Sequence, residues 1–408
     1  MRCRHCGEPV SKSFVDLGAS PPSNAYLSAG QLDVPERSYP LRVLVCGECR
    51  LVQTEDFAEV EELFSADYAY YSGFSTSWVE HCARFTEEMV RRFELGAASM
   101  VVEVASNDGT LLNRFHQRGI QSVGIEPTAG TARAARLLGL DIRQEFLTMA
   151  SAERLRSEGV NADLLAANNV VAHVPDINDF VGACCRLLAP GGVATFEFPH
   201  LMRLVEGKQF DTIYHEHFSY LSLTVMERVA AKCGLSIFDV EEIPTHGGSL
   251  RVFMGRSDGV RREVSDSVER LLESESLVGV DTDDFYQGFQ GQAEQIAEAV
   301  LDFLVRAHRS GRRVAGYGAA AKGNTLLNFA GIDGDLLPYV VDQNPAKQGL
   351  YLPGSRIPIV SEDRIHLEQP DHVLLLPWNL RTELVERLNY VRKWGATFVT
   401  AIPEVEIW

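Results

Sequence analysis

A tyrosine, two histidines and a glutamate stand in consecutive positions of this chain, at Tyr214, His215, Glu216 and His217. A protein core rarely gathers so many polar groups side by side, because each of them needs a hydrogen-bond partner. Proton-transfer sites do gather them, since imidazole titrates near neutral pH and a phenol or a carboxylate can orient it or stabilise an oxyanion. A solvated loop is the simpler interpretation of an isolated cluster. The other motifs of the chain favour a catalytic site.

A further histidine, His173, follows the expected fourth strand of an α/β sheet. That strand ends in Asn168 and Asn169, at the edge of the sheet where a bound cofactor would lie beside its substrate. A lone histidine is more often structural, but residues 214–217 follow the next strand and so face the same edge of the sheet. A neutral imidazole there can take a proton from a carbon next to a carbonyl group. Tyr214 or His173 can then donate a hydrogen bond to the enolate oxygen.

An acidic loop follows the first strand of the same sheet. The candidate cofactor-binding residues of this region, on the first two strands and the loop, are Glu103, Ser106, Asn107, Asp108, Gly109, Glu126 and Pro127. A dinucleotide site needs G-x-G-x-x-G, whose glycines let a pyrophosphate approach a helix N-terminus. Acidic side chains repel phosphate and suit a cationic nucleoside, and a second-strand carboxylate can hold ribose hydroxyls. The loop predicts an S-adenosylmethionine site, although Asn107 or Asp108 can also cap the next helix.

Two later segments are candidates for binding a substrate. Residues 316–324 read G-Y-G-A-A-A-K-G-N, a glycine-rich turn that can cradle a phosphate, with charge from Lys322 and an amide from Asn324. The alternative is that these glycines only allow a strand and a helix to pack closely. Residues 246–251 read H-G-G-S-L-R, in which His246 can reach a sugar or a diphosphate and Arg251 can bind phosphate bidentately. The alternative is that its glycines simply form a turn.

The N-terminal segment contains two C-x-x-C pairs, formed by Cys3, Cys6, Cys46 and Cys49. Zinc favours four thiolates in a tetrahedron, and this spacing lets two sulfurs of one turn reach a single ion. Gly7 and Gly47 suit the tight turns required. The pairs predict a structural zinc site, which leaves no open position for water and therefore has no catalytic role.

The patterning divides the chain into three domains. Residues 1–72 are rich in loops and proline and form a small zinc-binding domain with little core of its own. Residues 73–243 alternate strands and helices, which specifies a doubly wound α/β sheet of the class I methyltransferase type. Its expected strands are 100–104, 122–126, 163–168 and 192–198, and its expected helices are 79–93, 111–118, 131–138 and 179–188.

Residues 244–408 are expected to form a C-terminal Rossmann-like α/β domain. They begin with a short β segment at 249–254 and an acidic helical stretch at 264–307. The expected strands of the Rossmann-like part are 313–317, 338–341, 373–376 and 397–401.

Composition narrows the function further. The 408 residues carry a net charge of −18, which argues against general nucleic-acid binding because phosphate neutralisation needs a basic surface. No run approaches the roughly 20 apolar residues of a membrane span, and no apolar stretch follows the N-terminus. The cytoplasm is therefore the expected location, with no membrane partner. The oligomeric state stays open.

The order of these motifs resembles the sugar C-methyltransferases, which act on nucleotide-linked deoxyketosugars. The resemblance spans the chain and rests on the cysteine pairs together with E-V-A-S-N-D-G, G-I-E-P, N-N-V-V-A-H-V, Y-H-E-H-F-S-Y-L, H-G-G-S-L-R and G-Y-G-A-A-A-K-G-N. One departure is Ala105, where the family pattern has glycine. An alanine there should only narrow the approach to the cofactor.

The resemblance implies S-adenosylmethionine-dependent methylation at C-3 of a 4-keto sugar, usually carried by thymidine diphosphate. It implies that His217 is the base, that Tyr214 and His173 lie near the keto group and that Glu216 supports the histidines. It also implies that a tyrosine of residues 68–72, with Tyr68 the first candidate, covers the cofactor. The zinc domain is expected to contribute to the sugar pocket.

The resulting hypothesis is that His217 removes the C-3 proton, the keto group delocalises the charge, and the carbanion attacks the sulfonium methyl with inversion. A C-3 epimerase would use the same base, but the acidic loop with Glu126 argues against it. A non-catalytic sugar-nucleotide-binding protein would not need the cluster at 214–217. O-methylation is chemically simpler and stays open.

Overall fold

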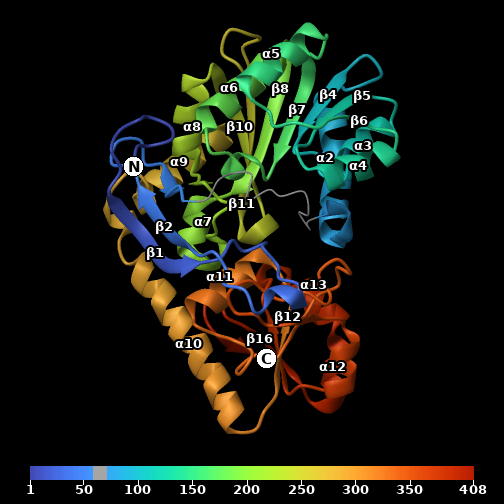
Figure 1. Cartoon of the computed structure of the whole chain (residues 1–408). Coiled ribbons are helices and arrows are strands. Elements are labelled where there is room, and N and C mark those ends of the chain that lie inside the picture. Colours follow the sequence, from blue (N-terminus) through green and yellow to red (C-terminus); the bar gives the residue numbers. More distant parts are fainter. Residues whose placement is uncertain (58–70) are drawn as a thin grey trace.

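Three β-sheets organise the chain in this computed structural model, which describes residues 1–57 and 71–408 (Figure 1). A large α/β domain lies at one end of the molecule and the C-terminal α/β domain at the other, with the N-terminal sheet beside the junction between them (Figure 1). Tyr68 lies outside the described residues, so its expected place over the cofactor stays a prediction.

The N-terminal sheet has an unexpected fourth strand. Its strands, in spatial order, are β1 (Lys12–Ser20), β2 (Tyr39–Val45), β3 (Val52–Thr54) and β9 (Ser219–Tyr220). The last of these directly follows residues 214–217, and it pairs Tyr220 with Val52. Helix α10 (Phe289–Arg309) completes the small core, where the ring of Phe289 stacks on Phe14 at 4.5 Å between centroids. The zinc-binding domain is thus built partly from the chain that carries the candidate catalytic residues.

The central sheet confirms the expected class I methyltransferase architecture. Its seven strands, in spatial order, are β10 (Leu235–Ile243), β11 (Ser249–Arg256), β8 (Leu188–Pro199), β7 (Ala162–Asn168), β4 (Met100–Val104), β5 (Gln121–Ile125) and β6 (Asp141–Arg143). Strands β6, β5, β4, β7 and β8 are parallel, whereas β11 is antiparallel to both of its neighbours. Because β11 belongs to this sheet, the central domain extends past the boundary expected at residue 243.

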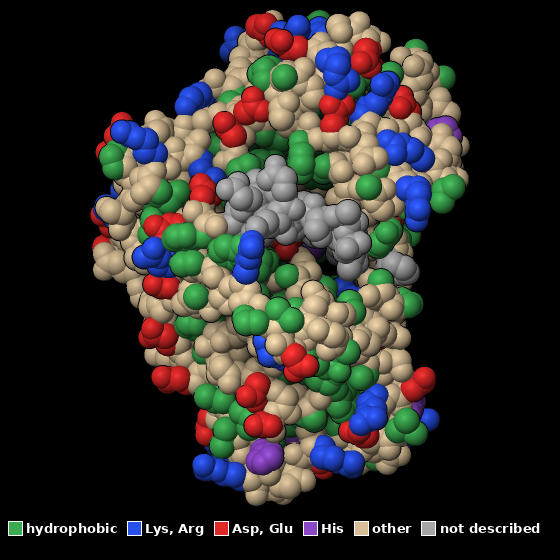
Figure 2. Space-filling model, viewed as in Figure 1, with side chains coloured by type: hydrophobic (Ala, Val, Ile, Leu, Met, Phe, Trp, Pro, Cys, Tyr) green, Lys and Arg blue, Asp and Glu red, His purple; other side chains and the backbone are tan. Residues whose placement is uncertain are grey.

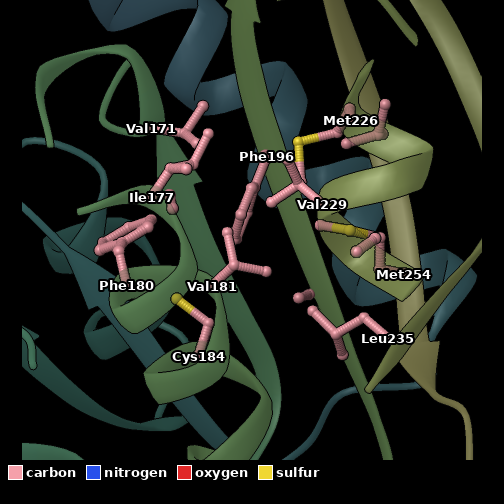
Figure 3. Packing of buried hydrophobic residues seen from close by; sticks show 14 of the residues in the cluster. Val171, Ile177, Phe180, Val181, Cys184, Phe196, Met226, Val229, Leu235 and Met254 are labelled. Atoms are coloured by element: carbon pink, nitrogen blue, oxygen red, sulfur yellow. The ribbon is translucent and has the colours of Figure 1, made fainter. Parts of the chain in front are cut away.

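Amphipathic helices cover the central sheet. They are α2 (Thr76–Arg92), α3 (Leu112–His116), α4 (Ala129–Leu137), α5 (Met149–Ser157), α6 (Ile177–Leu187), α7 (Leu201–Glu206), α8 (Leu223–Lys232) and α9 (Asp266–Val278). Figure 3 shows Val181 of α6 and Val229 of α8 packed against Phe196 of β8. Burying a side chain of this size contributes roughly 1.5–3 kcal/mol. This packing holds the strand ends that carry the site.

The C-terminal domain contains a second, smaller sheet. Its strands, in spatial order, are β14 (Ile359–Val360), β13 (Val340–Val341), β12 (Val314–Tyr317), β15 (His372–Leu375), β16 (Thr397–Thr400) and β17 (Glu406–Ile407). Its helices are α11 (Ala321–Phe329), α12 (Asp363–Glu368) and α13 (Arg381–Arg387). The four strands expected from the sequence are all present. Two-residue strands such as β14 and β17 are too short to show a periodicity.

Charges of both signs are interspersed over the face of the molecule shown in Figure 2, so the net charge of −18 is not gathered into one patch there. Among the described residues, no helix combines the length and the apolarity that a bilayer crossing requires.

Candidate active site

His217 is held in one tautomer at the junction of the three domains. Its ring Nδ1 lies 2.8 Å from the main-chain oxygen of Thr212. Because a carbonyl oxygen only accepts, Nδ1 must carry the proton, and Nε2 keeps a bare lone pair. Burial, reinforced by the charge of His173, lowers the pKa of His217 well below its ordinary range. The imidazole is therefore neutral at physiological pH and can act as a base through Nε2.

Two of the predicted partners of His217 lie against its ring. The centroid of His173 is 4.6 Å away in an edge-on arrangement, and that of Tyr214 is 4.0 Å away. Burial lowers the pKa of His173 to about 4, so this second imidazole is also neutral. His173 ends a 3-10 turn, Val171–His173, whose Ala172 accepts a hydrogen bond from the Phe218 amide. The structure thus brings together residues from two segments 40 positions apart.

Glu216 contacts a residue that the sequence analysis missed. Its carboxylate, which is 1% exposed, accepts hydrogen bonds from Nδ2 of Asn24 at 2.7 and 2.9 Å. The link to the histidines runs instead through the main-chain carbonyl of Glu216, which accepts a hydrogen bond from His173. His215 points elsewhere and donates from Nε2 to the Tyr39 carbonyl at 3.1 Å. Glu216 therefore supports His173 through its main chain, whereas its carboxylate contacts Asn24.

The acidic loop after β4 is held by Glu126, which follows β5, and by Ser72 and Gly73, which precede helix α2. The carboxylate of Glu126 accepts hydrogen bonds from the Asn107 amide at 2.9 Å and from the Thr128 amide at 2.8 Å. Ser72 donates its hydroxyl to the Asn107 side chain at 2.9 Å, and the Gly73 amide donates to Asp108 at 2.8 Å. The predicted loop residues are thus brought together. Ser72 and Gly73 were missed because their only role is this long-range contact.

Buried polar atoms without a partner gather at the ends of β4 and β7. In the described part of the chain they include Glu103 Oε2, Ser106 Oγ, both side-chain polar atoms of Asn168, and Asn169 Oδ1. Each such group costs about 1–3 kcal/mol if it stays unsatisfied, so their concentration indicates a polar ligand. Burial raises the pKa of Glu103 well above its ordinary value. Half-buried Pro127 follows Glu126 at the same edge. These donors and acceptors fit the hydroxyls and the amino-acid part of S-adenosylmethionine.

The four N-terminal cysteines form a compact cluster. Their sulfurs all lie within 4.8 Å of one another, with 3.4 Å between Cys3 and Cys49 and 3.5 Å between Cys6 and Cys46. Zinc–sulfur bonds of about 2.3 Å place tetrahedral sulfurs roughly 3.8 Å apart, so the cluster fits zinc. Gly7 has the left-handed φ of +82° expected of a knuckle glycine. Gly47 has no such role, because Arg50, with a φ of +65°, takes the equivalent place behind Cys49.

The glycine-rich turn after β12 serves packing. A Cβ on Gly318 would lie 2.5 Å from Cδ of Pro377, and one on Gly323 would lie 2.9 Å from Leu376. The amide of Ala319 donates to the Asp342 carboxylate at 2.8 Å. These contacts agree with the alternative of close strand–helix packing, and a phosphate contact at this turn stays a prediction.

Two of the expected substrate ligands serve other contacts. Arg251 is 4% exposed, and its guanidinium meets three carboxylates, those of Glu197 at 2.7 Å, Glu241 at 2.9 Å and Glu88 at 3.0 Å. A buried arginine so compensated has no charge left for a diphosphate, which corrects the expectation from H-G-G-S-L-R. Asn324 donates to the Ser23 carbonyl at 2.6 Å and so joins the C-terminal domain to the N-terminal one.

Lys322 does lie near the catalytic cluster. Its charge is among those that lower the pKa of His217. Nζ donates to Oδ1 of Asn379 at 2.8 Å and lies 4.9 Å from the centroid of the Trp378 ring. Burial lowers the pKa of Lys322, opposed by the carboxylate of Asp211. Lys322 therefore places an amino group from the C-terminal domain near His217.

Comparison with known proteins assigns the family. A family model described as a C-methyltransferase C-terminal domain matches residues 244–403, one for a zinc binding domain matches residues 3–64, and one for a methyltransferase domain matches residues 78–240. The C-methyltransferase NovU from Streptomyces niveus is 32% identical over 405 residues, which are 99% of this chain and 96% of that protein. The chain belongs to the C-methyltransferase family. The family expected from the motifs is thus confirmed.

Other similarities cover less of the chain. The ubiquinone biosynthesis O-methyltransferase of Bradyrhizobium sp. (strain ORS 278) is 31% identical over 117 residues, 25% of this chain and 44% of that protein. The solved structure of magnesium protoporphyrin IX methyltransferase (ChlM) from Synechocystis PCC 6803 with bound SAH covers 44% of this chain and 83% of its own, at 14% identity and a TM-score of 0.36. The PH0226 protein from Pyrococcus horikoshii OT3 covers 49% of this chain and 100% of its own, at 15% identity and a TM-score of 0.37.

The protein is therefore an S-adenosylmethionine-dependent C-methyltransferase with a structural zinc site. The residues at the ends of β4, β5 and β7 would hold the cofactor, which supplies an electrophilic methyl group. The four cysteines would hold the zinc, and four thiolates complete its tetrahedral coordination.

Ala105 in the cofactor loop carries backbone strain. Its φ of +53° lies in the left-handed region, where a β-carbon costs about 1–2 kcal/mol. The glycine that the family has there is thus a matter of backbone conformation as well as of room for the cofactor. We expect Ala105→Gly to raise the free energy of unfolding by about 1 kcal/mol, measured as a higher thermal midpoint. Ala98→Gly, at an exposed residue with ordinary φ, should instead lower the midpoint slightly. Equal changes in both variants would contradict the strain.

Asp211 should make stability depend on pH. It is fully buried and accepts a hydrogen bond from Nε1 of Trp378 at 2.7 Å. Burial raises the pKa of its carboxyl from 3.8 to about 6. The folded protein thus binds this proton more tightly than the unfolded chain does. As the pH rises from about 4 to about 6, the free energy of unfolding should therefore fall by up to about 3 kcal/mol because of Asp211.

The substitution Asp211→Asn keeps the acceptor for Trp378 and removes the ionisation. Its thermal midpoint should therefore exceed that of the wild type at pH 7 and match it near pH 4. The same substitution at exposed Asp281 should change the midpoint little at either pH. A midpoint of Asp211→Asn below the wild type at pH 7 would rule out the predicted cost.

Proposed function

We propose that the enzyme transfers a methyl group to C-3 of a nucleotide-linked 4-keto deoxysugar, with thymidine diphosphate as the expected carrier. The observation that carries the proposal is the tautomer of His217. Its Nδ1–H is committed to Thr212, so Nε2 keeps its lone pair and can serve as a neutral base. A hydrogen on carbon becomes acidic enough for imidazole only next to a carbonyl group, which is what a 4-keto sugar provides at C-3.

The other residues of the cluster take supporting roles in the proposal. Tyr214 and His173 border the ring of His217. Tyr214 can donate a hydrogen bond to the sugar, whereas His173, whose one N–H goes to the Glu216 carbonyl, offers the sugar an acceptor nitrogen. Glu216, through its bond from Asn24, fixes the loop against the N-terminal domain. Lys322 interacts electrostatically with His217 and suits the negative charge of the substrate. Placing His217 and the methyl donor on opposite faces of the sugar would invert C-3.

The test uses the wild-type enzyme in deuterated water with a thymidine diphosphate 4-keto deoxysugar. Without a methyl donor, we expect deuterium to replace the hydrogen at C-3, observed by nuclear magnetic resonance. With S-adenosylmethionine, the product should be heavier by one methylene group, with the new methyl on carbon.

The alternatives give different results in the same assay. Exchange with an inverted sugar but no gain in mass would indicate a C-3 epimerase. A gain in mass with the methyl on oxygen and no exchange would indicate O-methylation. Binding of the nucleotide sugar with neither change would indicate a non-catalytic binding protein.

A further inference from the structure

The turn that joins β10 to β11 holds a histidine in a strained conformation. His246 has φ of +56° and ψ of 18°, and Gly247 and Gly248 follow with φ of +93° and +114°. Only the glycines adopt such angles freely, because a β-carbon collides with the backbone in the left-handed region. Non-glycine residues persist there when the surroundings over-determine the backbone, and they concentrate at functional sites.

The surroundings do fix this turn from two domains. Gln209 donates its Nε2 to the Gly247 carbonyl at 2.8 Å. The Trp378 ring of the C-terminal domain sits so close to Gly247 that a β-carbon there would lie 2.4 Å from it. On the other side, the ring of Trp78 lies 6.5 Å from that of His246. The position of the His246 imidazole is thus fixed by residues outside the turn, namely Gln209, Trp378 and Trp78.

The turn that holds His246 borders the loop that holds His217. Trp378, which lies against Gly247, donates from Nε1 to Asp211 at 2.7 Å, and the next residue, Thr212, accepts the hydrogen bond from His217. Electrostatic interactions of His246 with His217, His173 and Lys322 agree with this proximity. Burial lowers the pKa of His246 to about 4, so the imidazole is neutral and keeps one N–H to donate. Within the described ranges, no side chain or main-chain group forms a hydrogen bond with either ring nitrogen. A half-buried donor without a partner in this place points to a ligand.

The chemistry favours a carbonyl group over a phosphate as that ligand. A diphosphate needs cations, whereas His246 is neutral and lies within the field of the Glu197 carboxylate. Resting on the proposed function, we propose that His246 donates a hydrogen bond to the keto oxygen of the substrate while His217 withdraws the neighbouring proton.

The proposed step needs only the substrate, His217 and His246 to account for the proton and the electron pairs. Nε2 of His217 takes the C-3 proton, and the electron pair of the C–H bond forms a double bond between C-3 and C-4. The π pair of the carbonyl moves to oxygen, where the N–H of His246 stabilises the negative charge. In the reverse direction the pair returns, and in deuterated water C-3 takes a deuteron from His217.

The test is exchange at C-3 without any methyl donor, measured at saturating nucleotide sugar. His246→Gly removes the donor and relaxes the backbone, and we expect the exchange rate to fall by about 100- to 1,000-fold with KM changed by less than about threefold. His246→Asn, which tolerates a positive φ and retains an N–H, should recover part of the rate. Gln369→Gly relaxes a comparable strained residue (φ of +47°) at the exposed end of α12 and should leave the rate unchanged.

The outcomes separate this role from its competitors. A raised KM with an undiminished rate would make His246 a diphosphate contact and overturn the proposal, as would full exchange in both His246 variants. Thermal melting of His246→Gly should give a midpoint within about 3 °C of the wild type, and His246→Asn carries the test if it does not. Absence of exchange in the wild type would contradict the proposed function itself.

Discussion

Replacing His217 with asparagine is expected to lower both C-3 exchange and methyl transfer by about 100- to 10,000-fold while the protein stays folded. Asparagine can place its Nδ2–H where Nδ1–H of the histidine now donates to the Thr212 carbonyl, so the loop keeps its anchor. What disappears is the lone pair of Nε2. Exchange by nuclear magnetic resonance and methyl transfer by mass spectrometry measure the two losses separately.

The neighbouring histidine supplies the matched control. His215 donates from Nε2 to the Tyr39 carbonyl, away from the cluster, and His215→Gln can keep that bond. Its exchange rate should stay within about threefold of the wild type. Undiminished exchange in folded His217→Asn would remove His217 from the role of base. A loss of exchange in His215→Gln as large as that in His217→Asn would show that any disturbance of the loop suffices.

Loss of zinc should abolish activity through the same loop. The four-cysteine cluster closes the turns that flank β2 and β3, and β3 pairs with β9, which begins two residues after His217. Structural zinc contributes about 10–16 kcal/mol in small domains, so its removal should melt the N-terminal sheet. We expect Cys46→Ser to lower the thermal midpoint by at least about 10 °C and the exchange rate by more than about 100-fold.

Zinc content, measured by atomic emission, should fall in Cys46→Ser together with the midpoint and the rate. Cys233→Ser is the control, because Cys233 is half-buried and outside the cluster, and a serine hydroxyl can keep its bond to the Asn178 carbonyl. It should retain zinc and activity. A zinc-free Cys46→Ser protein with normal exchange would show that the N-terminal sheet does not hold the base.

Local patterns predicted much of the fold. The β-branched run at Met100–Val104 is a strand because the middle of a parallel sheet is buried on both faces, and its bounds agree with the expectation. The cysteine pairs and the loop at 106–109 were also recognisable, since in each case the residues that matter are close together in the sequence. Strand β11 was misplaced, because a short β segment does not reveal which sheet it joins.

The type of a residue alone did not predict which groups it contacts. Arg251 has the side chain of a phosphate ligand, but it lies opposite Glu197 in the register of β11 and β8. Glycines at 316–323 have the spacing of a nucleotide turn, but Asp342 and Pro377 contact that turn. Asn24 and Ser72 carry no pattern at all, and their importance comes only from Glu216 and Asn107, which they contact.

The sequence by itself determined the chemical groups of this protein: the imidazole of the proposed base, the acidic loop of the proposed cofactor site, and two cysteine pairs, each formed by residues close in the chain. The tertiary structure alone decided how they act. It set the tautomer of His217 through Thr212, the close contact of Trp378 with the turn of His246, and the pairing of β9, just after His217, with the zinc domain. The physical reason is that burial and hydrogen bonding between distant segments, which no local pattern encodes, determine pKa, tautomer and orientation.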